Sequence, residues 1–137
     1  MGMLPSGLPE KVEDGEDLAR FLCQRSHFNS TSVKPAAFLP YRGETSVFRH
    51  GLKPAKELWK LGADLASSGR NLHGVAIIKA SDARKTGLEA VAAEPPPRHA
   101  ALREWPSHDD AAIQKARQLD IAIALASAAG EPIFKRS

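Results

Sequence analysis

The sequence predicts an α+β fold: a small, mainly antiparallel sheet of about four strands, with a long C-terminal helix packed on one face and one or two further helices. Short runs of apolar and β-branched residues, separated by glycine, proline, asparagine and serine, are typical of strands and turns. Segments with apolar residues three and four positions apart are typical of helices. The chain has 137 residues, 42% of them hydrophobic, which is enough to bury the core of one domain.

We expect residues 14–137 to form this single domain, after a flexible lead-in over residues 1–13 that has glycine, proline and little periodicity. A first helix is predicted from Asp14 or Gly15. Its apolar face would consist of Leu18, Phe21 and Leu22.

Two strands are predicted next. Residues 36–39 are a short apolar run between two prolines, which suits an edge strand because proline cannot donate to a ladder. Residues 45–50 form the second strand, rich in β-branched and aromatic residues. Successive side chains of a strand point to opposite faces, so Arg49 and His50 are expected on opposite faces.

Helices and strands alternate in the second half of the chain. Pro54 suits the first turn of a second helix. Residues 74–80 are the strongest predicted strand, with an apolar centre that indicates burial on both faces. Ser81 is predicted to cap a one-turn helix, and residues 88–93 to form a fourth strand. Residues 100–105 fit either a short strand or a helical turn.

The long C-terminal helix is predicted over about residues 108–129, after Ser107, which begins a capping-box pattern. Ile121 and Leu125 widen its apolar surface beyond one stripe. The helix is therefore expected either in the centre of the domain or against a partner, which would be another protein or a second copy. We expect residues 133–134 to pack back onto the core.

Composition restricts the location and the chemistry. No apolar run approaches the roughly 20 residues that cross a bilayer, and the N-terminus lacks the basic and apolar regions of a secretory signal, so we expect a cytoplasmic protein without membrane contact. Cys23 is the single cysteine, and we expect it to be a small core residue. No spacing of histidine and acidic residues predicts a metal site, and no cofactor motif is present.

Charge is distributed unevenly along the chain. Residues 1–19 have a net charge of −4, whereas residues 20–60 have a net charge of +6. A basic central segment favours an anionic partner, such as a nucleotide, a nucleic acid or a phosphorylated small molecule. The alternative is a solvated surface on which the acidic N-terminal segment folds back.

Four of the five histidines lie in short runs with arginine or glycine nearby, a combination suited to holding an anion and moving a proton. The candidate anion-binding residues are Arg42, Arg49, His50, Lys53, His73 and Arg98, and the candidate catalytic residues are His50, His73 and His99. If strands 45–50 and 74–80 are antiparallel neighbours, His50 and His73 lie at the same edge of the sheet. A phosphoesterase would use one histidine as general base, another as general acid and an arginine for the developing charge.

Nucleic-acid binding has separate support. Lys53, Lys56 and Lys60 are spaced along one side of the second predicted helix, which suits phosphate contacts. Aromatic residues make up only 6% of the chain, and no aromatic strand motif is present, so base stacking is not predicted.

The run Ser46-Val47-Phe48-Arg49-His50-Gly51 resembles the first strand of ADP-ribosyltransferases, in which an arginine or histidine followed by glycine holds the nicotinamide nucleotide. Residues 74–76 with 80–83 are similar to the second motif of that fold. Ala76 stands where the family has an aromatic residue or serine, and Glu89 and Glu94 are the acidic residues left to act as its catalytic glutamate. The resemblance covers about a third of the chain and implies a nucleotide transferase.

Three classes of function follow from the sequence. The first is a binding domain for a phosphate-bearing anionic partner, the second is an enzyme of the phosphoesterase or ADP-ribosyltransferase kind, and the third is a protein–protein interaction domain that uses the C-terminal helix. Whether the protein is an enzyme stays open at this point.

Overall fold

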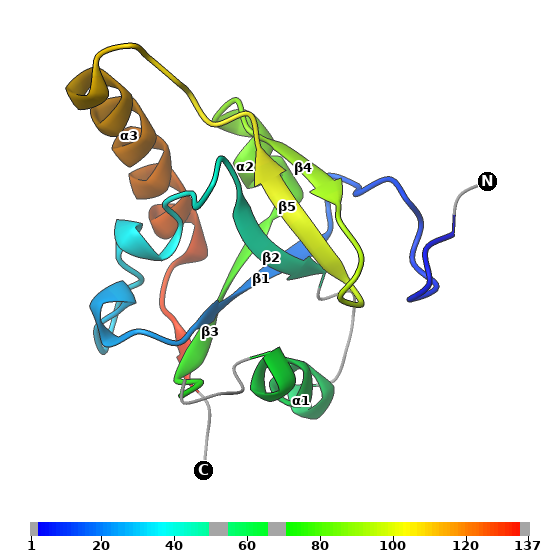
Figure 1. Ribbon diagram of the computed structural model, residues 1–137. Helices are drawn as coiled ribbons and strands as arrows, with labels where there is room; N and C mark the ends of the chain where they lie inside the picture. Colours follow the sequence, from blue (N-terminus) through cyan, green and yellow to red (C-terminus); the bar gives the residue numbers. More distant parts are fainter. Residues whose placement is uncertain (1–2, 50–54, 66–70, 135–137) are drawn as a thin grey trace.

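The structure, a computed structural model, describes residues 3–49, 55–65 and 71–134. Six strands form one sheet in the order β4-β5-β2-β1-β3-β6, and each neighbouring pair is antiparallel (Figure 1). The strands are β1 (Asp17–Leu22), β2 (Thr45–Arg49), β3 (Gly74–Lys79), β4 (Glu89–Ala92), β5 (His99–Arg103) and β6 (Ile133–Phe134). The predicted α+β class and antiparallel sheet are confirmed, but the sheet has six strands rather than about four.

Helices lie on both faces of the sheet (Figure 1). The long helix α3 (Ala111–Ala129), the short helix α2 (Ala80–Lys85) and a 3₁₀ turn, η2 (Pro35–Ala37), share the larger hydrophobic core on one face. Helix α1 (Ala55–Leu65) covers part of the opposite face, where the smaller core cluster lies. A second 3₁₀ turn, η1 (Arg25–His27), follows β1.

The first predicted helix is wrong, because residues 17–22 form the central strand β1. Leu18 and Leu22 have no exposed area and belong to the core beneath α3, whereas Ala19, equally buried, belongs to the cluster beneath α1. A strand buried on both faces has apolar residues at most positions, so it also satisfies the spacing that favoured a helix. Pairing with β3 over six residues stabilises the strand. This pairing joins distant parts of the chain, so the sequence of residues 17–22 alone does not indicate it.

The predicted edge strand at residues 36–39 is also wrong. Pro35 begins the 3₁₀ turn η2, and the Phe38 N–H donates to the Pro35 carbonyl at 2.9 Å. Ala37 and Phe38 are fully buried in the larger core. The apolar run therefore fills space against α3, the element that η2 contacts most, instead of extending the sheet.

The remaining predicted elements of the first three quarters of the chain are confirmed as β2, α1, β3, α2 and β4, and residues 99–103 form the strand β5. The caps differ from those predicted. Lys79 rather than Ser81 caps α2, and its N–H donates to Asp82 at 2.8 Å. Asp110 rather than Ser107 caps α3, where it accepts from two backbone N–H groups of the first turn.

The C-terminal part differs from the prediction in how its apolar residues are used. Leu125 is fully buried and Ile121 packs against the same core, so both belong to the interior of the domain. Ile133 and Phe134 form the edge strand β6 on β3 but stay 52% and 41% exposed, so they do not fill the core. Gly74 is needed in β3 because a Cβ there would lie 2.5 Å from the Ile133 carbonyl oxygen.

No helix in the described part of the chain combines the length and apolar character needed to cross a membrane.

Candidate functional site

The two central strands part after a short contact. β1 pairs with β2 at two positions, but with β3 at six. Arg20 lies where the first ladder stops, and its guanidinium donates to the Ala37 carbonyl at 2.7 Å and to the Ser46 carbonyl at 3.0 Å. The Arg20 side chain therefore replaces backbone hydrogen bonds of the ladder and stabilises the separation of the two strands.

A cleft of about 890 Å³ opens at this gap. Its described walls come from β1, β2, the start of β5, the turn before β2 and the helix α1. The rings of Phe21 and Phe48 lie with centroids 5.6 Å apart, and the His99 ring lies 5.1 Å from that of Phe48. One wall of the cleft is therefore apolar and aromatic, with neighbouring rings tilted by 40° and 48° to each other.

Positive charge predominates in the cleft. Arg20 and Arg42 both line it, and Arg42 is exposed, with its guanidinium 5.2 Å from the centre of the Tyr41 ring. Among the described lining residues the one carboxylate is Glu44, which accepts from Arg103 at 2.9 Å. The side chains left to meet a ligand are thus basic or neutral.

One nitrogen of the His99 ring acts as a hydrogen-bond donor. Its Nδ1 lies 2.8 Å from the Ala93 carbonyl oxygen, and because a carbonyl only accepts, Nδ1 donates. In the neutral ring, Nε2 then has the lone pair and can accept a proton. The hydrogen bond also fixes the ring against Phe48, where it lines the cleft.

His27 lies in the same cleft, at the end of the 3₁₀ turn η1. Burial, and then the charge of Arg20, lower the pKa of His27 from its ordinary value of 6.5. The shift favours the neutral ring at pH 7, in which one nitrogen can donate and the other can accept a hydrogen bond. An anion bound nearby would favour the protonated ring.

Cys23 is not a core residue as predicted. It is partly exposed and lines the cleft, directly after the end of β1. The prediction failed because it assumed a helix here, which would have turned the thiol toward the core.

Arg49, a predicted anion-binding residue, lies in a buried ion pair with Glu16. Its Nε and Nη2 donate to the two carboxylate oxygens at 2.7 and 2.9 Å, and Nη1 donates to the Pro9 carbonyl at 2.6 Å. The residue is 1% exposed. Its charge is therefore already neutralised within the chain.

Arg98 belongs to the same region. Its Nε donates to the Arg49 carbonyl at 2.7 Å, and its backbone N–H donates to Glu94 at 3.1 Å. Glu94 also accepts from the backbone N–H and the hydroxyl of Ser6. We call Ser6, Glu16, Arg49, Glu94 and Arg98 the N-terminal clamp, because they hold the chain before β1 against the sheet.

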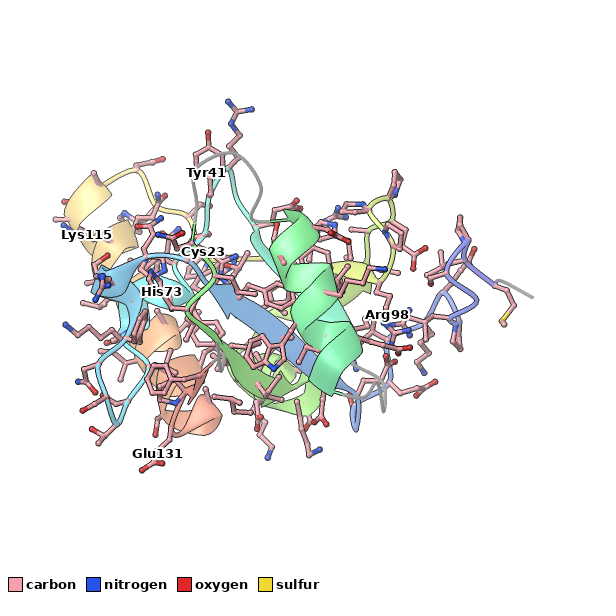
Figure 2. All side chains as sticks on the ribbon, turned by 90° about the horizontal axis from the view of Figure 1, so that it is seen from below. Cys23, Tyr41, His73, Arg98, Lys115 and Glu131 are labelled. Carbon is pink, nitrogen blue, oxygen red and sulfur yellow. The ribbon has the colours of Figure 1, made fainter. Side chains whose placement is uncertain are left out.

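The predicted meeting of His50 and His73 rested on antiparallel neighbouring strands, and that assumption is wrong. β1 lies between β2 and β3, so these two strands are parallel to each other. Arg49 at the end of β2 lies level with Ile78 at the far end of β3, opposite the end at which His73 precedes the strand. Figure 2 shows His73 and Arg98 on opposite sides of the molecule.

Of the predicted site residues, Arg42 and His99 line the cleft. Arg49 and Arg98 belong to the N-terminal clamp instead. His73 packs against the Phe28 ring. His50 and Lys53 lie outside the described residues. The prediction missed Arg20 and His27 as site residues. Their spacing in the sequence does not indicate a shared site. They meet only where β1 and β2 separate, and that separation depends on the order of the strands in the sheet.

Neither of the two glutamates that the ADP-ribosyltransferase resemblance offers as catalytic residue lines the described part of the cleft. Glu89 accepts from Arg84 at 2.7 Å, and Glu94 belongs to the clamp, so neither is among the described lining residues. Transferase activity stays a prediction.

Comparison with known proteins finds no matching family model, and neither the curated proteins nor the solved structures contain a significant match.

Proposed function

We propose that the cleft binds a small phosphate-bearing ligand of the nucleotide class, with its phosphate near Arg42 and its base against the Phe21 and Phe48 rings. The observation that carries the proposal is the meeting of two arginines, two histidines and an aromatic pair in one hollow. A nucleotide needs both chemistries, because its phosphate is an anion and its base has a flat apolar face.

The size of the cleft supports a small ligand. Its volume of about 890 Å³ lies within the range of roughly 300–1,000 Å³ that small-molecule sites span. A nucleic-acid strand would need a continuous basic surface. The enclosed size of the cleft therefore favours the nucleotide.

The two arginines have different parts in this proposal. Arg20 is held by two backbone carbonyls, so it positions the walls of the cleft and contributes its charge. Arg42 is exposed at the mouth and stacks on Tyr41, which leaves its N–H groups in position to donate to phosphate oxygens.

Calorimetric titration tests the proposal. We expect nucleoside 5′-diphosphates to bind more tightly than the matching nucleosides, and their affinity to fall as sodium chloride is added. Arg42→Gln should weaken diphosphate binding about tenfold to a hundredfold, the loss expected for a charge-assisted hydrogen bond.

Arg117→Gln is the matched control, because Arg117 is an exposed arginine of α3 that does not line the cleft. The proposal is wrong if no nucleotide of the four common bases binds, or if both variants lose affinity equally. Tighter binding of a single-stranded oligonucleotide would replace the nucleotide by nucleic acid as the ligand.

A phosphoesterase is a second candidate, favoured by the state of His99. With Nδ1 donating to Ala93, Nε2 can accept the proton of a water that attacks a phosphoester. Hydrolysis of a nucleoside 5′-monophosphate to the nucleoside and phosphate should then occur, and His99→Gln should abolish turnover while binding persists. Binding without any turnover in the unaltered protein would leave a binding domain alone.

A further inference from the structure

The N-terminal half of α3 extends beyond the sheet and is largely uncovered (Figure 1). Apart from Gln114 and Gln118, residues 111–120 are all exposed. Leu119 and Ile123 keep 39% and 48% of their surface exposed. A helix that contacted nothing except its own domain would have polar residues on this side.

Four apolar residues form one line along the exposed side, which we call the α3 seam: Ala112, Ala116, Leu119 and Ile123. Their spacings of four, three and four residues are those of a coiled-coil interface. The domain holds α3 from a different side through Ala122 and Leu125. Ala126, one heptad after Leu119, is buried in the core, so the exposed seam ends at Ile123.

The segment that precedes α3 also leaves the seam open. Gln118 donates to the Pro106 carbonyl at 2.9 Å, and Gln114 accepts from the His108 N–H at 3.0 Å. Both glutamines lie on the side of the helix away from the seam, so residues 106–108 pack there.

Charged residues beside the seam fit a second copy of this helix. The seven positions of a coiled-coil repeat are lettered a to g, and Ala116 and Ile123 both occupy position a. Lys115 then occupies position g, and Asp120 occupies the next position e. In two parallel helices, a g residue faces the e residue five positions later on the partner, so lysine meets aspartate twice across the two-fold axis. In an antiparallel pair, g faces g and e faces e, and these opposite charges do not meet.

We propose that the protein self-associates through the α3 seam as a parallel two-fold dimer, with Lys115 of each copy opposite Asp120 of the other. The helices are already folded in each copy, so no helix has to form on association. The seam has two large apolar residues per copy, which gives an interface at the small end of the size scale and a reversible dimer. The exposed ion pairs select the parallel direction and add little affinity.

Sedimentation of the full chain tests the dimer. Over roughly 10 µM to 1 mM, the range for small interfaces, we expect the average mass to rise from 14.8 kDa toward twice that value. Leu119→Glu and Ile123→Glu should each remain monomeric throughout, with an unchanged circular dichroism spectrum. Arg117→Glu, an exposed change away from the seam, should associate like the unaltered protein. A constant mass of 14.8 kDa for the unaltered protein overturns the proposal.

Charge exchange tests the parallel arrangement. Lys115→Glu or Asp120→Lys alone places like charges opposite each other and should weaken association, whereas the double variant should restore it. Ala116→Cys should form a disulfide between copies under mild oxidation, because equivalent a positions meet in a parallel pair, and Arg117→Cys should not. Failure of both the charge rescue and the cross-link overturns the parallel dimer.

Discussion

Arg49 illustrates how one residue can carry a strong sequence signal and a structural role. It lies in the predicted strand 45–50, and its place before His50 and Gly51 suggested an anion site. In the structure, Glu16 neutralises it, and the Pro9 and Lys11 carbonyls accept from two further N–H groups. Removing one partner of such a pair leaves an uncompensated buried charge, which costs about 3–5 kcal/mol.

Arg49→Met should therefore lower the free energy of unfolding by about 3–5 kcal/mol, measured by urea titration. Lys79→Met is the control, because it breaks the exposed ion pair with Asp17, and it should cost less than about 1 kcal/mol. Equal losses in the two variants would show that Arg49 is not held as described.

The same pair predicts a pH dependence. Burial alone would raise the pKa of Glu16, but its hydrogen bonds with Arg49 and the Glu13 backbone outweigh burial and place the pKa below its ordinary 4.5. A carboxylate with a lowered pKa stabilises the folded state above its unfolded value, and this stability is lost as the pH falls through the folded value.

Unfolding free energy should thus decrease between about pH 5 and pH 3 in the unaltered protein, and the decrease should be smaller in Glu16→Gln. Glu10→Gln, an exposed change, should keep the full decrease. An identical pH profile in all three proteins would contradict the assigned role of Glu16.

At the scale of the elements, the prediction was correct where local patterns determine the structure. The strand β3 and the helix α3 have continuous apolar or periodic sequences, and both are confirmed. Strand β1 failed because burial on both faces removes the alternation that identifies strands. The turn η2 failed because a short apolar run between prolines fits a strand and a packed turn equally well.

Helix α1 is set at its distance from the sheet by Gly62. A Cβ at this position would lie 2.7 Å from the Phe21 ring and 2.8 Å from Leu72, and both contacts are too close. Gly62→Ala should destabilise the protein by about 1–3 kcal/mol, despite the better helix propensity of alanine, because overpacking displaces the helix. Thermal unfolding measures this effect.

The exposed Asp64→Ala variant of the same helix is the comparison, and it should change stability by less than about 0.5 kcal/mol. Since Gly62 and Phe21 both line the cleft, Gly62→Ala should also weaken nucleotide binding. A stabilised Gly62→Ala protein would show that α1 does not pack as closely as the structure indicates.

At the scale of the whole molecule, strand order determined which basic residues meet. The sequence predicted a site of arginine and histidine side chains, and Arg42 and His99 share the cleft. The sequence did not predict that Arg20 and His27 line the same cleft. The prediction treated residues 17–22 as a helix, so the position of β1 beside β2 was unknown. The assumption that strands 45–50 and 74–80 are antiparallel neighbours was wrong for the same reason, since neighbours in a sheet are fixed by long-range pairing.

The most direct test of the account is a titration of the isotopically labelled protein with a nucleoside diphosphate, followed by amide chemical shifts. We predict saturable shifts concentrated in β1, the start of β2, the turn before it and the start of β5, with Phe21, Ser46 and His99 among the largest. Absence of shifts at millimolar ligand, or shifts centred on residues 111–120 of α3, which are not among the described lining residues, would contradict it.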